Sequence, residues 1–360
     1  MRSTDVLILG QGLAGSTLAW RLREHGLRTI VVDRGGVDAA GRPSSSRIAA
    51  GLITPVTGKR LTVAEGYADH FHEADRFYRR LGRALHFDCY ETQPAVRLFV
   101  SEAERALFEQ RVADGAIGEH ARLAERGDVP ASTPSPWGGF VMSGAARLNP
   151  AAYLGGTRGA LIDEDGLVQD AVEFETDIRP TDDGVAIPRF ELAARTVAFC
   201  TGYTPELPAC VPAERWAPTK GELLTIEAAG LPTDRVVHRG VWIAPIAAKP
   251  GASKRGPSLP DAAAANRYRV GATNEWEQLD STPTDAARDE LLAKLAEAGV
   301  TDAVVVDHQA AVRPATSDRK PIVGVSEDGR FAWLNGLGAK GALWAPTYAD
   351  RLAEQIVAAS

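Results

Sequence analysis

The sequence predicts an α/β fold, and three features of the chain carry this prediction. A short apolar run at 5–9 leads through a glycine-rich turn into a helical stretch at 16–25 and a second short strand at 29–32. A further apolar run at 196–202 ends in glycine, as strands of a doubly wound parallel sheet do at their ligand edge. Patterns typical of an antiparallel sheet follow at 222–227, 236–243 and 267–272.

The start of the chain has the residue order of a dinucleotide-binding unit. Gly10 allows a sharp turn, Gly12 lets the backbone approach a pyrophosphate, and Gly15 lets the helix pack closely on the sheet. The helix N-terminus then offers free N–H groups to an anion. Asp33 ends the second strand, where a carboxylate can accept hydrogen bonds from the hydroxyls of an adenosine ribose. Because all these parts agree, a plain glycine turn is the less favoured interpretation.

Composition limits the classes of function. The 360 residues suffice for one large domain or two ordinary ones, and 44% apolar with 24% charged residues is typical of a globular protein. The net charge of −7 argues against free-standing binding to nucleic acid. Three cysteines without a CxxC pair indicate a reducing compartment and no thiolate metal site, so no metal is predicted. With neither a signal peptide nor a membrane span in the sequence, we expect a cytoplasmic protein.

Turn residues divide the rest of the chain. A loop at 34–43 leads to a Ser- and Gly-rich stretch at 44–58, which is either an ordinary loop or a backbone that approaches a flat ligand. A β-meander is predicted over 168–187, and residues 249–266 read as a surface loop rather than a domain linker. Helices are predicted at 67–85, 101–115, 150–161, 282–299 and 346–358. In the fourth of these, Pro283 should occupy the first helical position.

Seven segments, taken in chain order, resemble the D-amino-acid oxidase and glycine oxidase family of FAD-dependent amine oxidoreductases. The two specific ones are an AxxRPxTxDxxPxxG run that begins at Ala310 and the glycine-rich loop at 335–341. The others are Gly10–Gly15 with Asp33 and Arg34, then 45–51, 199–202, 220–222 and 268–273. The resemblance covers the whole chain.

The resemblance implies a fold with two parts. A Rossmann-type FAD-binding domain, similar to those of D-amino-acid oxidase and glutathione reductase, would be discontinuous and contain residues 1–86, 145–213 and 307–360. A substrate domain of residues 87–144 and 214–306 would place a mainly antiparallel sheet over the flavin ring. The strand and helix patterns above agree with this division.

The resemblance also implies the residues that contact FAD. The loop at 337–343 should surround the pyrimidine end of the flavin, where Lys340 and the following helix N-terminus would stabilise negative charge; the alternative for Lys340 is a solvent-facing lysine. No cysteine lies near 313–321, where sarcosine-oxidase relatives attach flavin, so the FAD should be non-covalent. The predicted contacts are Gly10, Gly12, Leu13, Ala14, Gly15, Asp33, Arg34, Ser45, Ser46, Arg47, Ala50, Gly51, Leu52, Val172, Thr201, Gly202, Gly336, Leu337, Gly338, Ala339, Lys340 and Gly341.

Arg313 is the residue that the resemblance assigns to the substrate carboxylate. A planar guanidinium suits this task, because it forms two parallel charge-assisted hydrogen bonds. The alternative is a structural arginine tied to Asp318 or to a turn. Trp242 and Asn274 match pocket positions of glycine oxidase, although both depart from the residue types found there. Arg269 lies roughly where a lysine activates oxygen in sarcosine-oxidase relatives.

The predicted reaction is oxidation of the C–N bond of an amino acid or secondary amine carboxylate, with hydride transfer from carbon to flavin N5 and hydrolysis of the imine. Oxygen or another acceptor would reoxidise the flavin. Alternatives are a 2-hydroxy-acid oxidoreductase with the same arginine, a tRNA-modifying methylaminomethyl oxidase, and an NAD-dependent dehydrogenase. The charge of −7 and the missing methyltransferase domain disfavour the second, and the third leaves Arg313 and the 335–341 loop unexplained.

Overall fold

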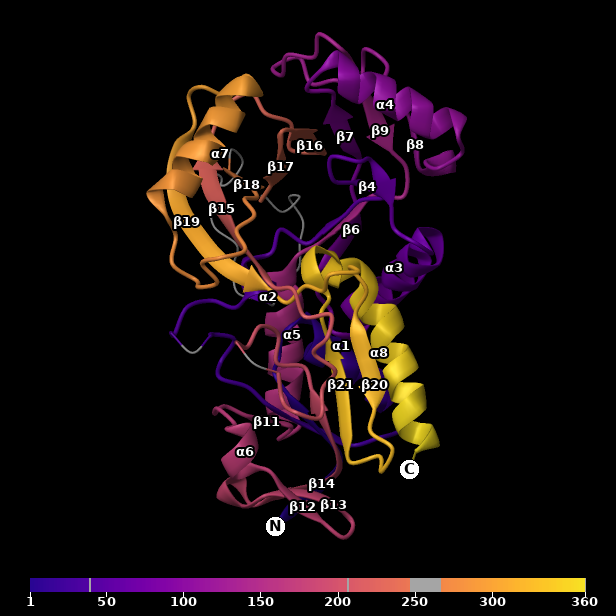
Figure 1. Cartoon of the computed structure of the whole chain (residues 1–360), viewed down its shortest axis with the longest axis vertical. Coiled ribbons are helices and arrows are strands. Elements are labelled where there is room, and N and C mark those ends of the chain that lie inside the picture. The colour runs from indigo at the N-terminus through magenta and orange to yellow at the C-terminus, as the bar shows by residue number, and fades with distance from the viewer. Residues whose placement is uncertain (39, 206, 247–266, 360) are drawn as a thin grey trace.

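A computed structural model describes residues 1–38, 40–205, 207–246 and 267–359. The ribbon has two lobes arranged along its long axis (Figure 1). Both chain ends lie in the lower lobe, together with the opening strand and the last helix. The upper lobe holds the second large sheet and the helices α4 (Glu102–Ala113) and α7 (Asp285–Glu297), and the short helix α2 (Ser45–Ile48) lies between the lobes.

The lower lobe is built on a mainly parallel sheet. Its order is β11-β2-β1-β14-β13-β12, and β21, which also pairs with β20, lies beside the C-terminal half of β14. Strands β1, β2, β11, β14 and β21 run parallel, and the other three are antiparallel to their neighbours. The bounds are Arg2–Leu9 (β1), Thr29–Val32 (β2), Leu167–Val168 (β11), Arg179–Thr181 (β12), Gly184–Ile187 (β13), Leu192–Phe199 (β14), Ile322–Val325 (β20) and Phe331–Asn335 (β21).

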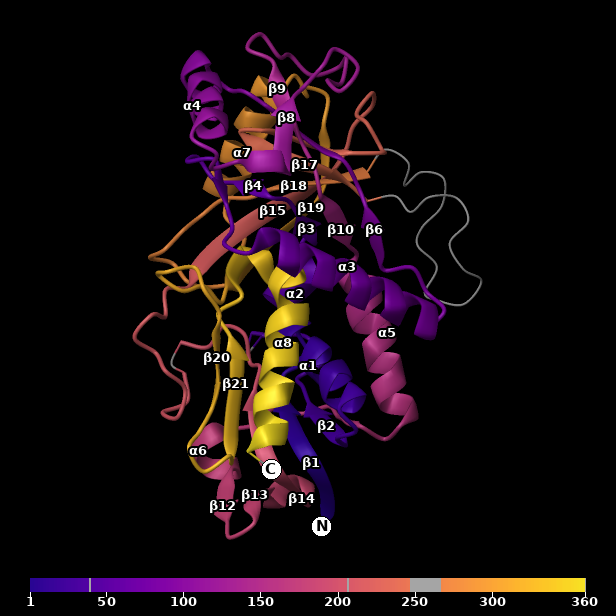
Figure 2. The same ribbon diagram turned by 90° about the vertical axis from the view of Figure 1, so that its right-hand side faces the viewer.

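Helices α1, α5 and α8 cover one face of this sheet, and α3 packs on α8, as Figure 2 shows from the side. Val6 and Ile8 of β1 are buried against these helices, whereas Leu7 and Leu9 belong to a second apolar cluster on the opposite face. Both faces are therefore covered, which explains why the opening strand is continuously apolar. The helices are α1 (Leu13–Glu24), α3 (Tyr67–Ala84), α5 (Pro150–Asp163) and α8 (Gly341–Ala358).

The upper lobe is built on the second large sheet, in the order β19-β15-β18-β17-β16-β7-β9-β8. All neighbours in it are antiparallel except β16 and β7. Helix α7 packs on one face through Leu291 and Leu295. The bounds are Ala95–Leu98 (β7), Ala121–Leu123 (β8), Gly139–Met142 (β9), Thr219–Glu227 (β15), Val236–Arg239 (β16), Val241–Pro245 (β17), Arg267–Gly271 (β18), Asp285–Glu297 (α7) and Val304–Arg313 (β19).

The remaining elements include α4 (Glu102–Ala113) in the upper lobe and α6 (Phe174–Asp177) in the lower lobe. The others are short: α2 (Ser45–Ile48), β3 (Leu52–Ile53), β4 (Val56–Thr57), β5 (Thr62–Val63), β6 (Tyr90–Thr92) and β10 (Ala146–Leu148). Helix α4 begins as the sequence predicts, because the Ser101 side chain accepts a hydrogen bond from the Glu104 backbone N–H. No helix in the described ranges is long and apolar enough to cross a membrane.

Three predicted elements differ in the structure. The meander predicted over 168–187 is interrupted by helix α6, where the Asp177 carboxylate accepts a hydrogen bond from the Glu173 N–H and closes a helical turn. The strand predicted at 236–243 is two strands, because Gly240 takes a left-handed φ of 70° and reverses the chain. Thr284 caps α7, so Pro283 precedes the helix instead of occupying its first position.

The predicted division into two domains stays a prediction. The two large sheets separate much as expected, yet the predicted boundary at residue 307 falls inside β19, which pairs with β15 in the second sheet. The last helix begins at Gly341, five residues before the predicted start, because Ala342–Ala345 are buried against the parallel sheet and extend the helix past Pro346. The surface loop predicted at 249–266 lies outside the described residues.

Candidate functional site

The carboxyl ends of the parallel strands meet at one edge of the sheet. The register pairs Leu9 of β1 with Val32 of β2 and with Phe199 of β14. Phe199 in turn pairs with Trp333 of β21. The residues that follow these strands therefore lie together, and they include Gly10, Asp33, Thr201, Gly202 and Gly336. This edge is where ligands bind in open parallel sheets.

The glycine turn is packed too closely for side chains. Gly10 has a φ of 103°, and a Cβ there would lie 2.5 Å from the Cys200 carbonyl oxygen. A Cβ on Gly15 would overlap the Gly10 carbonyl oxygen, so helix α1 approaches the turn only because residue 15 is glycine. Gly12 is the N-cap of α1 and lies against the Ser46 hydroxyl, which accepts a hydrogen bond from the Leu13 N–H at 3.1 Å.

Asp33 organises the next turn. Its carboxylate accepts hydrogen bonds from the Gln11 N–H at 2.8 Å and the Gly36 N–H at 2.6 Å. The guanidinium of Arg158, from α5, lies 3.7 Å away and also bonds the side chains of Gln11 and Gln169. No sequence pattern singles out Arg158 or Gln169, because α5 and the segment after β11 reach this edge only through the fold.

The segment at 45–52 passes between the two large sheets. A Cβ on Gly36 would overlap the Arg47 guanidinium, whose Nε is buried with no hydrogen-bond partner among the described residues. Arg269 of the second sheet donates to the carbonyl oxygens of Ile48 at 2.5 Å and Ala49 at 2.9 Å. Burial lowers the pKa of Arg269. It is thus not the solvated strand residue that a lone arginine usually is.

The glycine-rich loop after β21 contacts both the predicted FAD-binding edge, at Gly202, and the residue that follows Arg313, Pro314. Asn335 donates from its side chain to the Gly202 carbonyl at 2.9 Å, and the Gly338 N–H donates to the Pro314 carbonyl at 2.8 Å. Gly336 has a φ of 72° and Gly338 a φ of 53°, which explains the glycines. Leu337, Ala339 and Gly341 form the rest of this loop, and Gly341 packs on Leu13.

Lys340 is not the freely solvated alternative of the sequence analysis. Its ammonium lies over the Trp344 ring, 5.2 Å from the ring centroid, and burial lowers its pKa. Arg34 is half-exposed and lies 3.7 Å from Glu173. Val172 is buried in the apolar cluster on the second face of the parallel sheet. These positions do not show whether the residues contact FAD, so the assignments of Lys340, Arg34 and Val172 to the cofactor site stay predictions.

Arg313 lies at the end of β19, on the face of the second sheet that points toward the 45–52 segment. It donates to the Asn274 side-chain oxygen at 3.1 Å and the Thr273 carbonyl at 3.2 Å. In the described part of the chain no carboxylate lies within ion-pair distance of it, and burial lowers its pKa. The suggested partner Asp318 instead pairs with Arg215 at 2.6 Å. The tie to Asp318 is therefore excluded.

The strand register places the other predicted substrate residues on the same face. Trp242 lies opposite Gly271, which lies opposite Leu223, so the indole ring covers the glycine. Trp242 also packs beside Ile48 of α2 and Leu223. Arg269 lies two residues before Gly271 in β18, so its side chain is on the same face of the sheet. Asn274 is exposed near the start of the loop that follows β18, where its side-chain oxygen accepts a hydrogen bond from Arg313.

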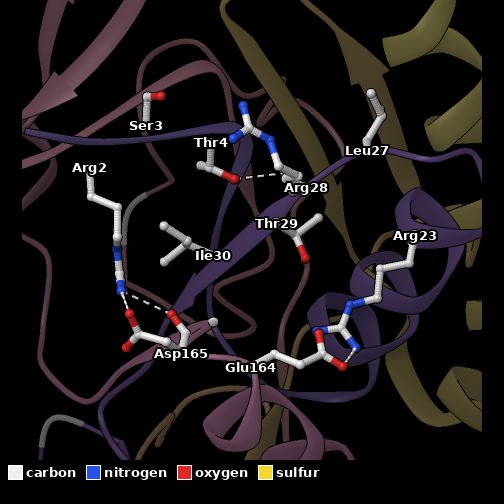
Figure 3. Close-up of a pocket in the computed structure, with 11 residues that line it drawn as sticks. Arg2, Ser3, Thr4, Arg23, Leu27, Arg28, Thr29, Ile30, Glu164 and Asp165 are labelled. Atoms are coloured by element: carbon white, nitrogen blue, oxygen red, sulfur yellow. Dashed lines mark hydrogen bonds and ion pairs between the residues drawn. The ribbon is translucent and has the colours of Figure 1, made fainter.

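A measurable cavity lies elsewhere, at the opposite edge of the parallel sheet. It has a volume of about 370 Å³ and lies beside the first residues of β1 and β2 (Figure 3). Its arginines already have partners, since Arg2 pairs with Asp165 and Arg23 pairs with Glu164. None of the predicted site residues lines it.

Comparison with known proteins identifies the family. The model of the FAD dependent oxidoreductase (DAO) family matches residues 5–355. The chain belongs to this family. It is thus an FAD-dependent oxidoreductase with the Rossmann-type α/β fold that the sequence predicts, and its recognition as a family member is confirmed.

Solved structures of other oxidoreductases share the fold. Glycine oxidase from Geobacillus kaustophilus superposes with a TM-score of 0.78 at 19% identity, covering 100% of this chain and 96% of that one. Iminodiacetate oxidase from Chelativorans sp. BNC1 gives a TM-score of 0.72 at 19% identity, covering 99% of this chain and 96% of that one.

Curated relatives are of two kinds. Glycine oxidase of Pseudomonas aeruginosa is 28% identical over 371 residues, which is 98% of this oxidoreductase and 94% of the relative. A bifunctional protein of tRNA 5-methylaminomethyl-2-thiouridine biosynthesis from Maricaulis maris is also 28% identical, over 384 residues. The match covers 98% of this chain and 52% of that relative, so the chain spans about half its length.

The strand-end edge of this oxidoreductase fits the cofactor of its family. Glycines at positions 10, 12 and 15 keep side chains away from the turn that would hold a diphosphate. The Arg47 Nε and the Thr201 hydroxyl are both buried without partners among the described residues, and both adjoin this edge. Asp33 would bind the ribose, and the loop at 336–341 would adjoin the flavin. Buried donors normally have a hydrogen-bond acceptor, and an anionic ligand at this edge would supply one.

Proposed function

We propose that this chain oxidises the C–N bond of a small amine that carries a carboxylate, an amino acid or a secondary amine acid. The observation that carries the proposal is the setting of Arg313. Its guanidinium is partly buried and, among the residues that the structure describes, is bonded only to the neutral oxygens of Asn274 and Thr273. It therefore keeps both its charge and free N–H donors for an anion.

Positioning is the task of the protein in this reaction. Arg313 would bind the substrate carboxylate, Trp242 would form an apolar wall, and Asn274 would orient the guanidinium. When bound, FAD supplies the redox chemistry, because it accepts the hydride from the carbon next to nitrogen. The imine product then hydrolyses in water. Such a reaction depends on holding the substrate rather than on a catalytic acid or base.

A panel of substrates tests the proposal. The purified protein should be yellow, and anaerobic addition of amino acids or N-alkyl amino acids should bleach the flavin with at least one member. Arg313→Ala should abolish bleaching by carboxylate substrates while FAD content is unchanged. Amines without a carboxylate serve as the matched control, because they do not need Arg313. If no amine bleaches the flavin, the amine-oxidase proposal is wrong.

The same panel separates the other candidates. A 2-hydroxy acid could use Arg313 in the same way, so bleaching by hydroxy acids and not by amines would favour that class. Unfractionated tRNA belongs in the panel because of the relatives in tRNA biosynthesis. Admitting oxygen after bleaching and measuring peroxide would show whether oxygen is the acceptor. Denaturation should release the flavin, because we propose that it is not covalently bound.

A further inference from the structure

The strand that lies under Arg313 carries a buried lysine with no role so far. Strand β15 contains Lys220, Gly221 and Glu222 in succession, and adjacent side chains of a strand point to opposite faces. A Cβ on Gly221 would lie 1.9 Å from the Arg313 Nη2, so this residue faces the guanidinium. Lys220 and Glu222 therefore point to the other face, toward α7.

The ammonium group of Lys220 is bound by the C-terminal end of the loop of residues 272–284, which joins β18 to α7. Its ammonium donates to the Asp280 carboxylate at 2.8 Å and to the Thr282 carbonyl at 2.6 Å, and lies 3.6 Å from Glu222. Only 1% of its side chain is exposed, against 43% of that of Asp280. Burying an ammonium group is costly unless it is paired, so these contacts determine where the loop can lie.

Glu222 fixes the same loop from the neighbouring position. Its carboxylate accepts hydrogen bonds from the Thr284 N–H at 2.8 Å and the Thr284 hydroxyl at 3.0 Å, and lies 2.9 Å from the His308 Nε2. Thr284 is also the N-cap of α7. The loop is thus fastened to β15 and to the first turn of α7.

The N-terminal end of this loop binds the guanidinium of Arg313. Thr273 exchanges hydrogen bonds with Glu222, and Glu275 exchanges two backbone hydrogen bonds with Lys220. Between them, the Thr273 carbonyl and the Asn274 side chain accept from Arg313. Lys220 thus anchors both ends of the loop, by its backbone at Glu275 and by its ammonium at Asp280 and Thr282.

We infer that Lys220 is a positioning residue for the substrate carboxylate. It fixes the loop of residues 272–284, and this loop fixes the guanidinium of Arg313. The inference rests on the proposed function of Arg313. Lys220 does not touch the substrate: its effect passes through Thr273 and Asn274.

The test measures carboxylate binding to the FAD-loaded protein, with acetate as the probe and acetamide as the neutral comparison. Titration is followed by the visible absorbance of the flavin. Lys220→Met should weaken acetate binding roughly tenfold to a hundredfold, because a guanidinium displaced by about 1 Å no longer matches its ligand. Acetamide binding and FAD content should stay unchanged. Lys220→Arg, which keeps the charge, should restore part of the affinity.

Two further variants make the result decisive. Asp280→Asn breaks the ion pair at its exposed end and leaves the hydrogen-bonding shape, so it should weaken acetate binding in the same direction, even if Lys220→Met fails to fold. Lys294→Met is the matched control, because that lysine pairs with Glu290 on the surface of α7. It should not change acetate binding.

The single variant Arg313→Ala separates the inference from the proposed function. If Arg313→Ala leaves acetate binding intact, the proposed function fails. If Arg313→Ala abolishes acetate binding but Lys220→Met and Asp280→Asn bind acetate as the parent does, only the inference is overturned. A positioning role also requires that Lys220→Met has no further effect, in the Arg313→Ala background, on flavin reduction by amines without a carboxylate.

Discussion

A methyl group at position 221 should displace Arg313, the residue that we propose binds the substrate carboxylate, without unfolding the protein. In Gly221→Ala the new Cβ would lie 1.9 Å from Nη2, 2.2 Å from Cζ and 2.6 Å from Nη1 of Arg313. Ordinary van der Waals contact begins at 3.4 Å, so the nearest nitrogen must retreat by about 1.5 Å. Catalytic positioning fails at displacements of about 1 Å. We therefore expect kcat/KM for carboxylate substrates to fall by about 10²-fold, which is about 2.7 kcal/mol.

Stability should change little in the same variant. Gly221 lies within β15 and does not need a left-handed backbone, so alanine fits its conformation. Replacing glycine also lowers the entropy of the unfolded chain, a gain of up to about 1 kcal/mol. The atoms that must move are the end of one flexible side chain. Thermal unfolding should therefore show a midpoint close to that of the parent protein.

The assay compares Gly221→Ala with Gly155→Ala. A Cβ on Gly155, in helix α5, meets nothing within 4 Å, so this control should keep full activity and gain stability from helix propensity. Stopped-flow flavin reduction and acetate titration are measured for both. If Gly221→Ala reduces flavin and binds acetate as the parent does, the guanidinium beside Gly221 is not where the carboxylate binds.

Three other predictions follow from single contacts. Asp33→Ala should weaken FAD binding at least about tenfold in equilibrium dialysis, because the Gln11 and Gly36 N–H groups lose their acceptor and the ribose loses its predicted one. Unchanged affinity would remove Asp33 from the cofactor site. Burial raises the pKa of the Cys200 thiol to about 12, so it should resist alkylation at neutral pH until the protein unfolds, and rapid labelling of the native state would contradict this. Ser101→Ala removes the cap of α4 and should lower the free energy of unfolding by about 1 kcal/mol in urea titrations.

The parts of the fold that the sequence predicts are those encoded by local spacing. Gly10, Gly12, Gly15 and Asp33 act within one strand-helix-strand unit, and the capping box at Ser101 acts within one turn. The failures have a different origin. Helix α8 begins before Pro346 because burial on the parallel sheet outweighs the cost of the proline, and no local pattern contains that burial.

The contacts within the candidate site depend even more on residues that are distant in the sequence, and local patterns do not predict them. Arg313 could be singled out by resemblance, but its setting depends on Gly221, Thr273 and Asn274, which are distant in sequence. Lysine is among the least buried residue types, so the sequence gives no reason to expect Lys220 to be buried. Its place becomes clear only when β15 and the loop at 272–284 are seen together.

Arg269 shows how a residue chosen for chemistry can also hold the fold together. It donates to the last carbonyls of α2, and Arg147 of β10 donates to the next one, at Ala50, at 3.3 Å. Burial lowers the pKa of Arg147 to about 10, and its neighbour Arg269 adds to the effect. Cations suit a helix C-terminus because its carbonyls lack partners. The two arginines therefore fasten the segment predicted to pass the flavin, and Arg269 ties it to the second sheet. Loss of Arg269 should thus weaken FAD binding, and measuring reoxidation by oxygen beside FAD affinity would test whether this arginine also has the predicted role in oxygen activation.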